Sequence, residues 1–430
     1  MPFERTGPTP RRIAVIGGGI SGMAAALELA RDHAVTLIES ETRLGGHART
    51  VIAGKNGDQP VDTGFIVFNK VNYPHLVALF DRLDVPIADS DMTFAASLRG
   101  GRLEYSTRTV DTLFAQRRNL LHPRFMGMVR DIMRFNANAA EARKDGSMSL
   151  REFLDSLGLG HAFREWYLGP ISGAIWSTPR SEIMDFPAEA MIRFFDNHNL
   201  LHHSGQHAWF TVKGGSIEYV RRLEAELRRL GVEIRTGAPV QAVTRAHGGA
   251  QVKLDGAEWD SFDEVILATH ADVSLRLLAD ADPEEQAILS RIRTQPNEAV
   301  LHSDPAQMPR NRKCWACWNY VEGDTPPERI GLTYWMNELQ PIPKDDPLFV
   351  TLNPQTPIRE DLIHDVTTFR HPLYDLPMLS AVEELKARNG TRGTWYCGAW
   401  MRNGFHEDGY ASAVAVARAM ARRDAVDAAA

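Results

Sequence analysis

Residues 14–30 read AVIGGGISGMAAALELA, and this stretch decides the fold. Ile13–Ile16 is a short apolar run with β-branched side chains, which is typical of a buried parallel strand. Gly17–Gly22 then follows the pattern G-x-G-x-x-G, whose glycines permit a tight turn and bring backbone N–H groups close to a pyrophosphate. A helix beginning at this turn directs the positive end of its dipole at the same anion. The stretch therefore predicts a strand, a turn and a helix that bind a dinucleotide.

A second strand with an acidic end supports this prediction. Val35–Ile38 is again apolar and β-branched, and Glu39 follows it, 17 residues after Gly22. A carboxylate at this position binds the ribose hydroxyls of an adenosine. A glycine pattern alone is weak evidence, but strand, glycines, helix, strand and acid in this order favour a ligand site over a ligand-free turn.

Composition excludes several classes of protein. The chain has 430 residues, is 43% hydrophobic and 24% charged, and carries a net charge of −7. These values predict a globular protein of two domains, with no general affinity for nucleic acid. No apolar run reaches the roughly 18 to 20 residues of a membrane span, and residues 1–12 lack the apolar core of a secretory signal. The three cysteines, Cys314, Cys317 and Cys397, cannot form a disulfide framework, so we expect a cytoplasmic protein.

The segment after the second strand specifies the dinucleotide. In VTLIESETRLGGHART, residues 35–50, the spacing Arg43-x-Gly45-Gly46-x-x-x-Thr50 resembles the R-x-G-G-R-x-x-[ST] signature of the flavin-containing amine oxidase, phytoene desaturase and protoporphyrinogen oxidase superfamily. The resemblance implies FAD that is tightly but non-covalently bound, with the second glycine pair against its pyrophosphate. His47 stands where the superfamily usually has arginine, which removes a permanent charge that Arg49 is placed to replace.

The resemblance continues in order from about residue 11 to residue 420. Val61–Asn69 (VDTGFIVFN) corresponds to the segment beside the flavin ring, and Asp263–Ala271 (DEVILATHA) to the strand that returns to the cofactor. Residues 395–410 (WYCGAWMRNGFHEDGY) resemble the closing motif, whose helix begins at the pyrimidine edge of the flavin, although the last glycine of that motif is missing. The resemblance implies FAD contacts at Gly17, Gly19, Ile20, Ser21, Gly22, Glu39, Ser40, Arg43, Gly45, Gly46, His47, Gly64, Phe65, Ile66, Val240, Ala268, Thr269, Gly398, Glu407, Asp408 and Gly409.

The implied fold combines the α/β and α+β classes. A Rossmann-like FAD-binding domain of the glutathione-reductase type is expected from the discontinuous segments 10–85, 207–275 and 390–424. Segments 86–206 and 276–389 are expected to form an inserted, mixed substrate-binding domain. This second part is rich in aromatic and apolar residues, as in FREWYLGPISGAIWS (163–177), which could line an acyl tunnel or simply fill a core.

Several short phrases indicate a narrower group. GFIVFN, AIWS, WNY, TYWMN, VTLNP and GFHEDG resemble bacterial NAD/FAD-binding proteins encoded beside cyclopropane-fatty-acyl-phospholipid-synthase-like methyltransferases, a group that includes the methylated fatty acid desaturase of furan fatty acid synthesis. The resemblance implies desaturation of a lipid acyl chain by hydride transfer to FAD, the substrate being a methyl-branched unsaturated acyl group of a phospholipid. A lipid methyltransferase is the implied partner. A double-bond isomerase, a small-molecule amine oxidase and a flavin-bound accessory subunit of such a methyltransferase are the alternatives.

Polar residues beside the flavin would have to take the second proton of a desaturation. His406 and Glu407, just before the closing helix, are the catalytic candidates, and a helix cap or a contact to ribityl hydroxyls is the alternative for each. Four histidines, His198, His202, His203 and His207, lie within ten residues, but no supporting carboxylate accompanies them, and we predict no metal site. For Cys314-x-x-Cys317, two buried inert thiols are favoured over a redox pair.

One basic segment is a candidate for membrane contact. FAQRRNLLHPRFMGMVRDIMRF, residues 114–135, has arginines at 117, 118, 124, 130 and 134 interleaved with apolar residues. Such a pattern suits peripheral attachment to anionic lipid, here through residues 117–134 at the inner face of a membrane. An amphipathic helix packed on its own domain has the same pattern. Farther on, Ser149-x-x-Glu152 predicts a capping box at the start of a helix.

Overall fold

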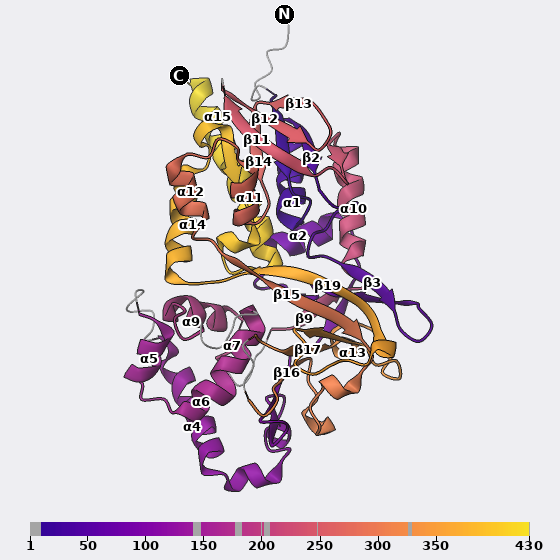
Figure 1. The fold of residues 1–430 in the computed structure, drawn as a ribbon, viewed down its shortest axis with the longest axis vertical. Helices are drawn as coiled ribbons and strands as arrows, with labels where there is room; N and C mark the ends of the chain where they lie inside the picture. Colours follow the sequence, from indigo (N-terminus) through magenta and orange to yellow (C-terminus); the bar gives the residue numbers. More distant parts are fainter. Residues whose placement is uncertain are drawn as a thin grey trace, which may run out of the picture.

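The computed structural model describes residues 10–140, 148–176, 183–198, 200–201, 207–246, 248–325 and 329–429. Its upper part in Figure 1 is built on a five-stranded sheet with the order β10-β2-β1-β14-β20, in which all neighbouring strands are parallel. These strands are β1 (Arg12–Ile16), β2 (Ala34–Ile38), β10 (Glu233–Arg235), β14 (Glu264–Leu267) and β20 (Thr394–Tyr396). The sheet thus joins segments from both ends of the chain, and it confirms the predicted fold class.

Alternation along β1 places side chains on both faces of this sheet. Ile13 and Val15 join the apolar cluster of the helices α1 (Ile20–Leu29), α2 (Pro74–Arg82), α10 (Ile217–Arg229) and α15 (His406–Ala429). Ala14 and Ile16 face the other way, toward α11 (Ala271–Leu277), α12 (Pro283–Leu289), α14 (Leu376–Arg388) and the antiparallel sheet of β11 (Val240–Ala246), β12 (Gly249–Leu254) and β13 (Trp259–Phe262). A strand buried on both faces explains the continuous apolar run seen in the sequence.

A seven-stranded sheet, β19-β15-β18-β17-β16-β7-β8, forms the middle of the molecule. Its neighbours are antiparallel except for β16 and β7. The strands are β7 (Phe94–Leu98), β8 (Leu103–Ser106), β15 (Thr294–His302), β16 (Trp318–Val321), β17 (Leu332–Trp335), β18 (Phe349–Leu352) and β19 (Ile363–Pro372), with α13 (Met336–Leu339) after β17. The sheet therefore unites strands from both segments that were predicted to form the substrate-binding domain.

Two small antiparallel sheets complete the β-structure. One pairs β3 (Thr50–Ala53) with β4 (Gln59–Asp62), and the other has the order β5 (Val67–Asn69), β9 (Trp209–Val212) and β6 (Ile87–Ser90). The second of these sheets crosses the predicted boundary at residue 86. Single helical turns of the 3-10 or π type are η1 (Arg117–Leu121), η3 (Arg164–Leu168), η4 (Pro305–Gln307), η5 (Arg312–Cys314), η6 (Glu360–Leu362), η7 (Thr391–Gly393) and η8 (Ala399–Met401).

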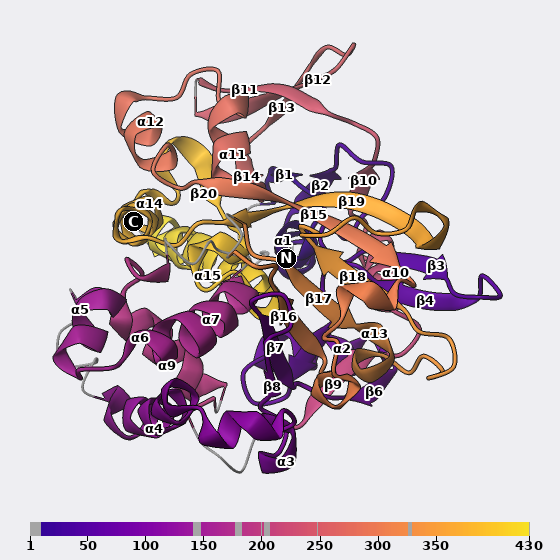
Figure 2. The ribbon, with the colours of Figure 1, turned by 60° about the horizontal axis from the view of Figure 1, so that its bottom comes forward.

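The remaining helices form a helical lobe at the lower end of Figure 1, and Figure 2 shows them side by side. They are α3 (Val110–Leu113), α4 (Pro123–Asn138), α5 (Leu150–Ser156), α6 (His161–Phe163), α7 (Gly169–Trp176) and α9 (Ala188–Asn197). The predicted capping box is confirmed, because Ser149 and Glu152 each accept a hydrogen bond from the other's backbone N–H at the start of α5. Within the described ranges, no helix has the length and apolar character needed to cross a membrane.

A buried ion cluster ties β11 to the parallel sheet. The side chain of Arg245, 1% exposed, donates two hydrogen bonds to Glu285 at 2.6 and 2.8 Å, one to the Asp280 carboxylate at 2.8 Å and one to the Asp280 carbonyl at 3.1 Å. Glu285 also accepts a hydrogen bond from the Tyr396 hydroxyl, at 3.0 Å. The charges in this cluster compensate one another, so removal of one partner leaves a charge without compensation in the core.

We expect Arg245→Met to lower the free energy of unfolding by about 3 to 5 kcal/mol, because it leaves Glu285 buried without its cation. The matched control is Arg359→Met, since Arg359 pairs with Asp361 in an exposed contact with side chains 66% and 63% exposed. That variant should change the free energy of unfolding by less than about 1 kcal/mol. Urea unfolding measures both, and equal effects would contradict this account of the cluster.

Candidate cofactor site

The glycine turn after β1 lies at the carboxyl ends of three parallel strands. Gly17 donates its N–H to Ile38 O, at 2.8 Å, and the N–H of Ala268 donates to Ile16 O, at 2.8 Å. A Cβ atom at Gly17 would lie 2.7 Å from Ala268 O, and one at Gly22 would lie 1.8 Å from Gly17 O. Only glycine fits at these two positions, so α1 approaches β1 and β14 as closely as the backbone allows.

The second glycine pair lies directly against the first. Gly45 donates its N–H to Gly18 O at 2.8 Å, and a Cβ at Gly46 would lie 3.1 Å from the Cα of Gly19. Arg43 holds this loop from within, since its guanidinium donates to Gly46 O at 3.0 Å and to Ala48 O at 3.2 Å. The structure thus brings the two predicted phosphate loops together.

The beginning of α1 fits an anion. A Cβ at Gly19 would have no atom within 4 Å, and α1 begins without a side-chain cap and without an acidic residue in its first turn. The N–H groups of the first turn, which includes Ile20 and Ser21, therefore lie beside open space at the positive end of the helix dipole. A pyrophosphate suits this cradle, and the residues present fit the predicted dinucleotide.

Glu39 lies beside the glycine turn, at the carboxyl end of β2. Its carboxylate accepts hydrogen bonds from the N–H of Gly18 at 2.6 Å and from the Ser40 hydroxyl at 2.9 Å. Ala238 donates its N–H to Glu39 O at 2.9 Å, which places the start of β11 at Val240 near the carboxylate. Glu39, Ser40 and Val240, which the resemblance assigns to the adenosine half of the cofactor, therefore lie in one neighbourhood.

The closing segment packs on the glycine turn. A Cβ at Gly409 would lie 2.8 Å from Ile20 Cγ2 and 2.8 Å from Ser21 Oγ, so the first turn of α15 meets the first turn of α1. Gly398 donates its N–H to the Ser412 hydroxyl at 2.9 Å, and the indole of Trp400 donates to Thr269 O at 3.1 Å. Residues 268–269, 398 and 409 thus converge on the same edge of the parallel sheet.

The predicted flavin segment lies against the start of α15. Phe65 donates its N–H to His47 O at 2.9 Å, and its ring stacks on that of His406 with centroids 3.9 Å apart. A Cβ at Gly64 would lie 2.1 Å from His47 O, which explains a glycine there. Ile66 is held by a hydrogen bond from the Thr211 hydroxyl to its carbonyl, at 2.8 Å.

The two catalytic candidates differ in their contacts. The ring of His406 is buried, and its Nε2 lies 2.7 Å from the Tyr219 hydroxyl. Burial lowers the pKa of His406 to about 3, so the imidazole is neutral at physiological pH.

Glu407 is engaged at the beginning of another helix. Its two carboxylate oxygens accept the N–H groups of His75 at 3.1 Å and Leu76 at 3.0 Å, and the His75 imidazole lies 2.6 Å away. These contacts give Glu407 the capping role that was the alternative to catalysis. Asp408 similarly accepts the N–H of Phe405 at 3.0 Å, and burial raises its pKa to about 6.

His47 lies in a cluster that the sequence did not reveal. Its ring stacks on Phe369, with centroids 4.9 Å apart, and lies within 6 Å of the rings of His270 and His371. Burial lowers the pKa of His47, so it supplies no positive charge in place of arginine. Arg49 does not supply it either, because its guanidinium binds Asp365 at 2.6 and 3.0 Å. Phe369 and His371 come from β19, more than 300 residues away.

Asp62 is a further residue that the motif analysis did not single out. It is 1% exposed and accepts hydrogen bonds from the Thr50 hydroxyl at 2.6 Å, the Ser216 hydroxyl at 2.7 Å and Gln340 Nε2 at 2.9 Å. Burial raises its pKa to about 6. The sequence signal that could have indicated Asp62 was Thr50, the threonine that ends the second glycine motif. A hydroxyl that is removed from water needs a hydrogen-bond partner.

The histidine and cysteine groups show structural contacts. His198 stacks on Phe194 with centroids 3.9 Å apart, and His207 bonds the carbonyl of Asn197 at 3.1 Å, whereas His202 and His203 lie outside the described residues. In the part of the chain that is described, no group of three or more His, Cys, Asp or Glu side chains could hold a metal ion. Cys314, Cys317 and Cys397 are buried free thiols, and burial raises the pKa of each to about 12.

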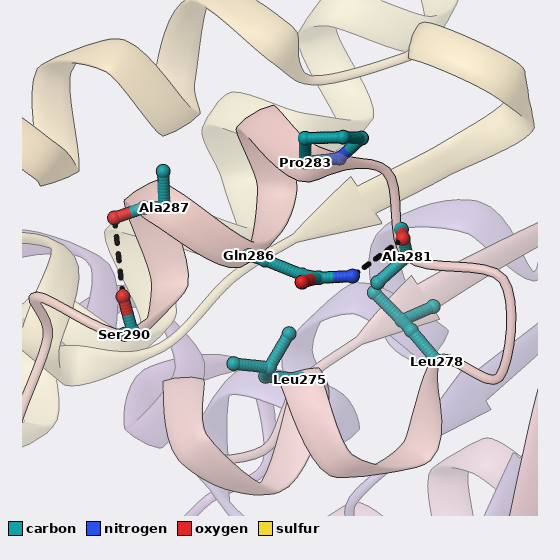
Figure 3. Close-up of a pocket in the computed structure, with 7 residues that line it drawn as sticks. All are labelled: Leu275, Leu278, Ala281, Pro283, Gln286, Ala287 and Ser290. Atoms are coloured by element: carbon teal, nitrogen blue, oxygen red, sulfur yellow. Dashed lines mark hydrogen bonds between the residues drawn. The ribbon is translucent and has the colours of Figure 1, made fainter.

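One open hollow lies away from this edge. It measures about 650 Å³ between α11 and α12 (Figure 3) and is lined by Leu275, Leu278, Ala281, Pro283, Gln286, Ala287 and Ser290. None of the predicted cofactor residues lines it, so it plays no part in the site.

The neutral state of His406 predicts a pH dependence of stability. Its folded pKa of about 3 lies below the ordinary 6.5, so the unfolded chain binds a proton as the pH falls and the folded chain does not. The contribution of His406 to the free energy of unfolding is therefore fully present above pH 6.5 and is lost as the pH falls toward 3. Between pH 7 and pH 5 the loss is about 2 kcal/mol. His406→Gln should reduce the pH-dependent loss in urea unfolding by that amount, and an unchanged loss would contradict the assignment.

Comparison with known proteins identifies the family. The sequence pattern of the flavin-containing amine oxidoreductase family matches residues 20–312. The carotenoid phi-ring synthase of Chlorobaculum tepidum is 30% identical over 272 residues, which are 58% of this chain and 40% of that protein. The chain thus aligns with less than half of the length of that relative.

Solved structures share the fold over nearly the whole chain. A CLA-producing fatty acid isomerase from P. acnes superposes with a TM-score of 0.67 at 17% identity, covering 95% of this chain and 98% of that one. Cyclohexylamine oxidase from Brevibacterium oxydans superposes with a TM-score of 0.67 at 12% identity, covering 96% and 99%. Because the family pattern spans more than half of the sequence, the chain belongs to the flavin-containing amine oxidoreductases, a family of flavin-dependent enzymes.

Proposed function

We propose that the protein binds FAD non-covalently and desaturates a lipid acyl chain, a methyl-branched unsaturated acyl group of a phospholipid. The backbone of the Gly17–Gly22 turn and of Gly45–Gly46 would hold the pyrophosphate, and Glu39 the adenosine ribose. Gly64–Ile66, Gly398 and the first turn of α15 would border the flavin. FAD, when bound, supplies an acceptor for a hydride. The protein's own task is to position a C–H bond and to take up the second proton.

The observation that carries the proposal is an aromatic cluster that begins beside the candidate site, with Phe405 half-buried and its partners buried. Phe405, next to His406, stacks on Phe194 of α9 with centroids 5.0 Å apart, and Phe194 contacts Trp176 of α7 at 4.8 Å. Both partners belong to the helical lobe. An acyl chain offers no polar group along its length, so aromatic side chains of this kind would hold it by contact area alone.

Three imidazoles around the candidate site carry no charge at neutral pH. Burial lowers the pKa of His198 and His371 to about 4 and that of His406 to about 3. Neutral rings suit a hydrocarbon better than a charged ligand, because no charge has to be desolvated when the substrate binds. The two relatives named for a carotenoid ring synthase and a fatty acid isomerase support the same substrate class.

Of the two catalytic candidates, His406 suits proton uptake better. Its imidazole is neutral, and the contact of 2.7 Å between its Nε2 and the Tyr219 hydroxyl orients the ring. Glu407 has both oxygens committed to the start of α2. We therefore place the second proton on His406. We assign Glu407 to anchoring the start of α15, which carries both residues, on the start of α2.

Anaerobic mixing of the purified flavoprotein with phospholipids tests the proposal. Phospholipids with methyl-branched monounsaturated chains should bleach the flavin absorbance, and mass spectrometry should show the loss of two hydrogens from the lipid. Matched phospholipids without the methyl branch are the control. A moved double bond with no bleaching would instead establish the isomerase, which the fold shared with the fatty acid isomerase supports.

Other outcomes would also replace the proposal. Bleaching by amines but not by lipids would establish a small-molecule oxidase, since the cyclohexylamine oxidase shares the fold equally well. No change in any lipid or amine, together with co-purification of a lipid methyltransferase, would establish an accessory subunit.

Gly19→Ala separates cofactor binding from folding. Gly19 has φ −74°, and a Cβ there meets no atom within 4 Å, so the free energy of unfolding of the cofactor-free protein should stay within about 1 kcal/mol. The methyl group would occupy the space of the pyrophosphate, and the purified variant should lose most of its flavin.

The matched control is Gly127→Ala in α4, where a Cβ likewise meets nothing within 4 Å. It should retain the flavin and gain about 0.5 to 1 kcal/mol, because alanine is the better helix former. Full flavin content in Gly19→Ala would contradict the proposed position of the pyrophosphate.

A further inference from the structure

Exposed apolar side chains gather on one part of the helical lobe. Eleven large hydrophobic side chains of the described residues are exposed, and five of them fall between residues 110 and 133. These are Val110, Leu120, Leu121, Met126 and Met133. Leu121, at 89% exposure, is the most exposed of all eleven.

Helix α4 shows that this exposure is organised. Phe125, Met128 and Phe135 are fully buried and anchor one face of the helix. Met126 and Met133, seven residues apart, lie on the opposite face and are 40% and 52% exposed. Because residues seven apart share a helix face, the two methionines form a stripe that is about half exposed. The packed-helix alternative accounts for the buried face of α4 but not for the exposure of this one.

Five arginines lie in the same segment as the stripe. Arg117, Arg118, Arg124, Arg130 and Arg134 are all exposed, in a chain whose net charge is −7. The two aspartates of residues 110–138 are already bonded, Asp111 to Arg117 and Asp131 to Arg130 and the N–H of Gly160. No ion pair to Arg118, Arg124 or Arg134 occurs within the described ranges. The surface therefore attracts anions while the molecule as a whole repels them.

The position of the segment suits a planar partner. Figure 1 shows α4 at the lower end of the molecule, opposite β11, β12 and the C-terminal end of α15. Along the chain, Leu120 and Leu121 lie between Arg118 and Arg124, and Met126 and Met133 follow between further arginines. Long arginine stems can lie along acyl chains while their guanidinium groups reach lipid phosphates.

We propose that residues 110–134, here called the basic tip, dock on an anionic phospholipid membrane. Leu120, Leu121, Met126 and Met133 enter the interface, and the arginines bind the lipid phosphates. This inference goes beyond the proposed function, because it concerns where the protein sits and not what it oxidises. Its test requires no turnover, so it can fail or succeed independently of the desaturase proposal.

Vesicle co-sedimentation of the flavin-loaded full chain tests the proposal. Vesicles of phosphatidylcholine with phosphatidylglycerol should bind the protein. Vesicles of phosphatidylcholine alone should bind it at least tenfold more weakly, on the order expected for the loss of the anionic lipid. Arg118→Gln/Arg124→Gln and, separately, Leu120→Ser/Leu121→Ser should each weaken binding to the anionic vesicles on the order of tenfold. High salt should weaken binding of the wild type in the same way.

Matched controls come from the exposed surface of α15. Arg418→Gln/Arg422→Gln removes the same two charges, and Val426→Ser removes an exposed apolar side chain. Both variants should bind as the wild type does. Absence of binding to anionic vesicles would overturn the proposal, as would equal weakening by the α15 variants, which would show a general charge effect. Concentration-dependent self-association that Leu120→Ser/Leu121→Ser abolishes, without vesicle binding, would assign the basic tip to a second copy of the chain.

Discussion

The close approach of the first helix to the first strand is the constraint on which the rest of the structure depends. With only 1.8 Å between a Cβ at Gly22 and the carbonyl of Gly17, no side chain can separate α1 from the parallel sheet. That contact fixes where α1 begins, and so it fixes the open, uncapped first turn at Gly19. Gly46 and Gly409 then meet the same turn from two other parts of the chain. Three distant segments thus converge because each has a glycine where a larger residue would clash.

The cofactor edge is also coupled to the seven-stranded sheet. Asp62 joins Thr50, at the end of the second glycine loop, to the beginning of α10 and to Gln340 after α13. Arg49 binds Asp365 of β19, and His47 packs on Phe369 of the same strand. The loop that faces the cradle is therefore held from both sides.

The sequence predicted what neighbouring residues determine together. The order of β1, α1 and β2, the carboxylate after β2 and the cap at Ser149 all follow from residues close along the chain, where periodicity and capping patterns apply. Contacts between distant residues could not be predicted in this way. No pattern near Glu407 reveals that α2 will need a cap, and none near His47 reveals Phe369 and His371. Such pairs meet only because the sheets bring them together, and single-sequence reasoning does not contain that geometry.

Identification of the released cofactor tests whether the protein binds FAD non-covalently. The protein is denatured, the chain is separated from the supernatant, and both are examined for flavin by absorbance and mass. We expect equimolar FAD in the supernatant and none on the chain, since the cradle of Gly17–Gly22 and Gly45–Gly46 fits a pyrophosphate and the buried cysteines are not reactive. FMN in place of FAD, or flavin that stays on the denatured chain, would contradict it.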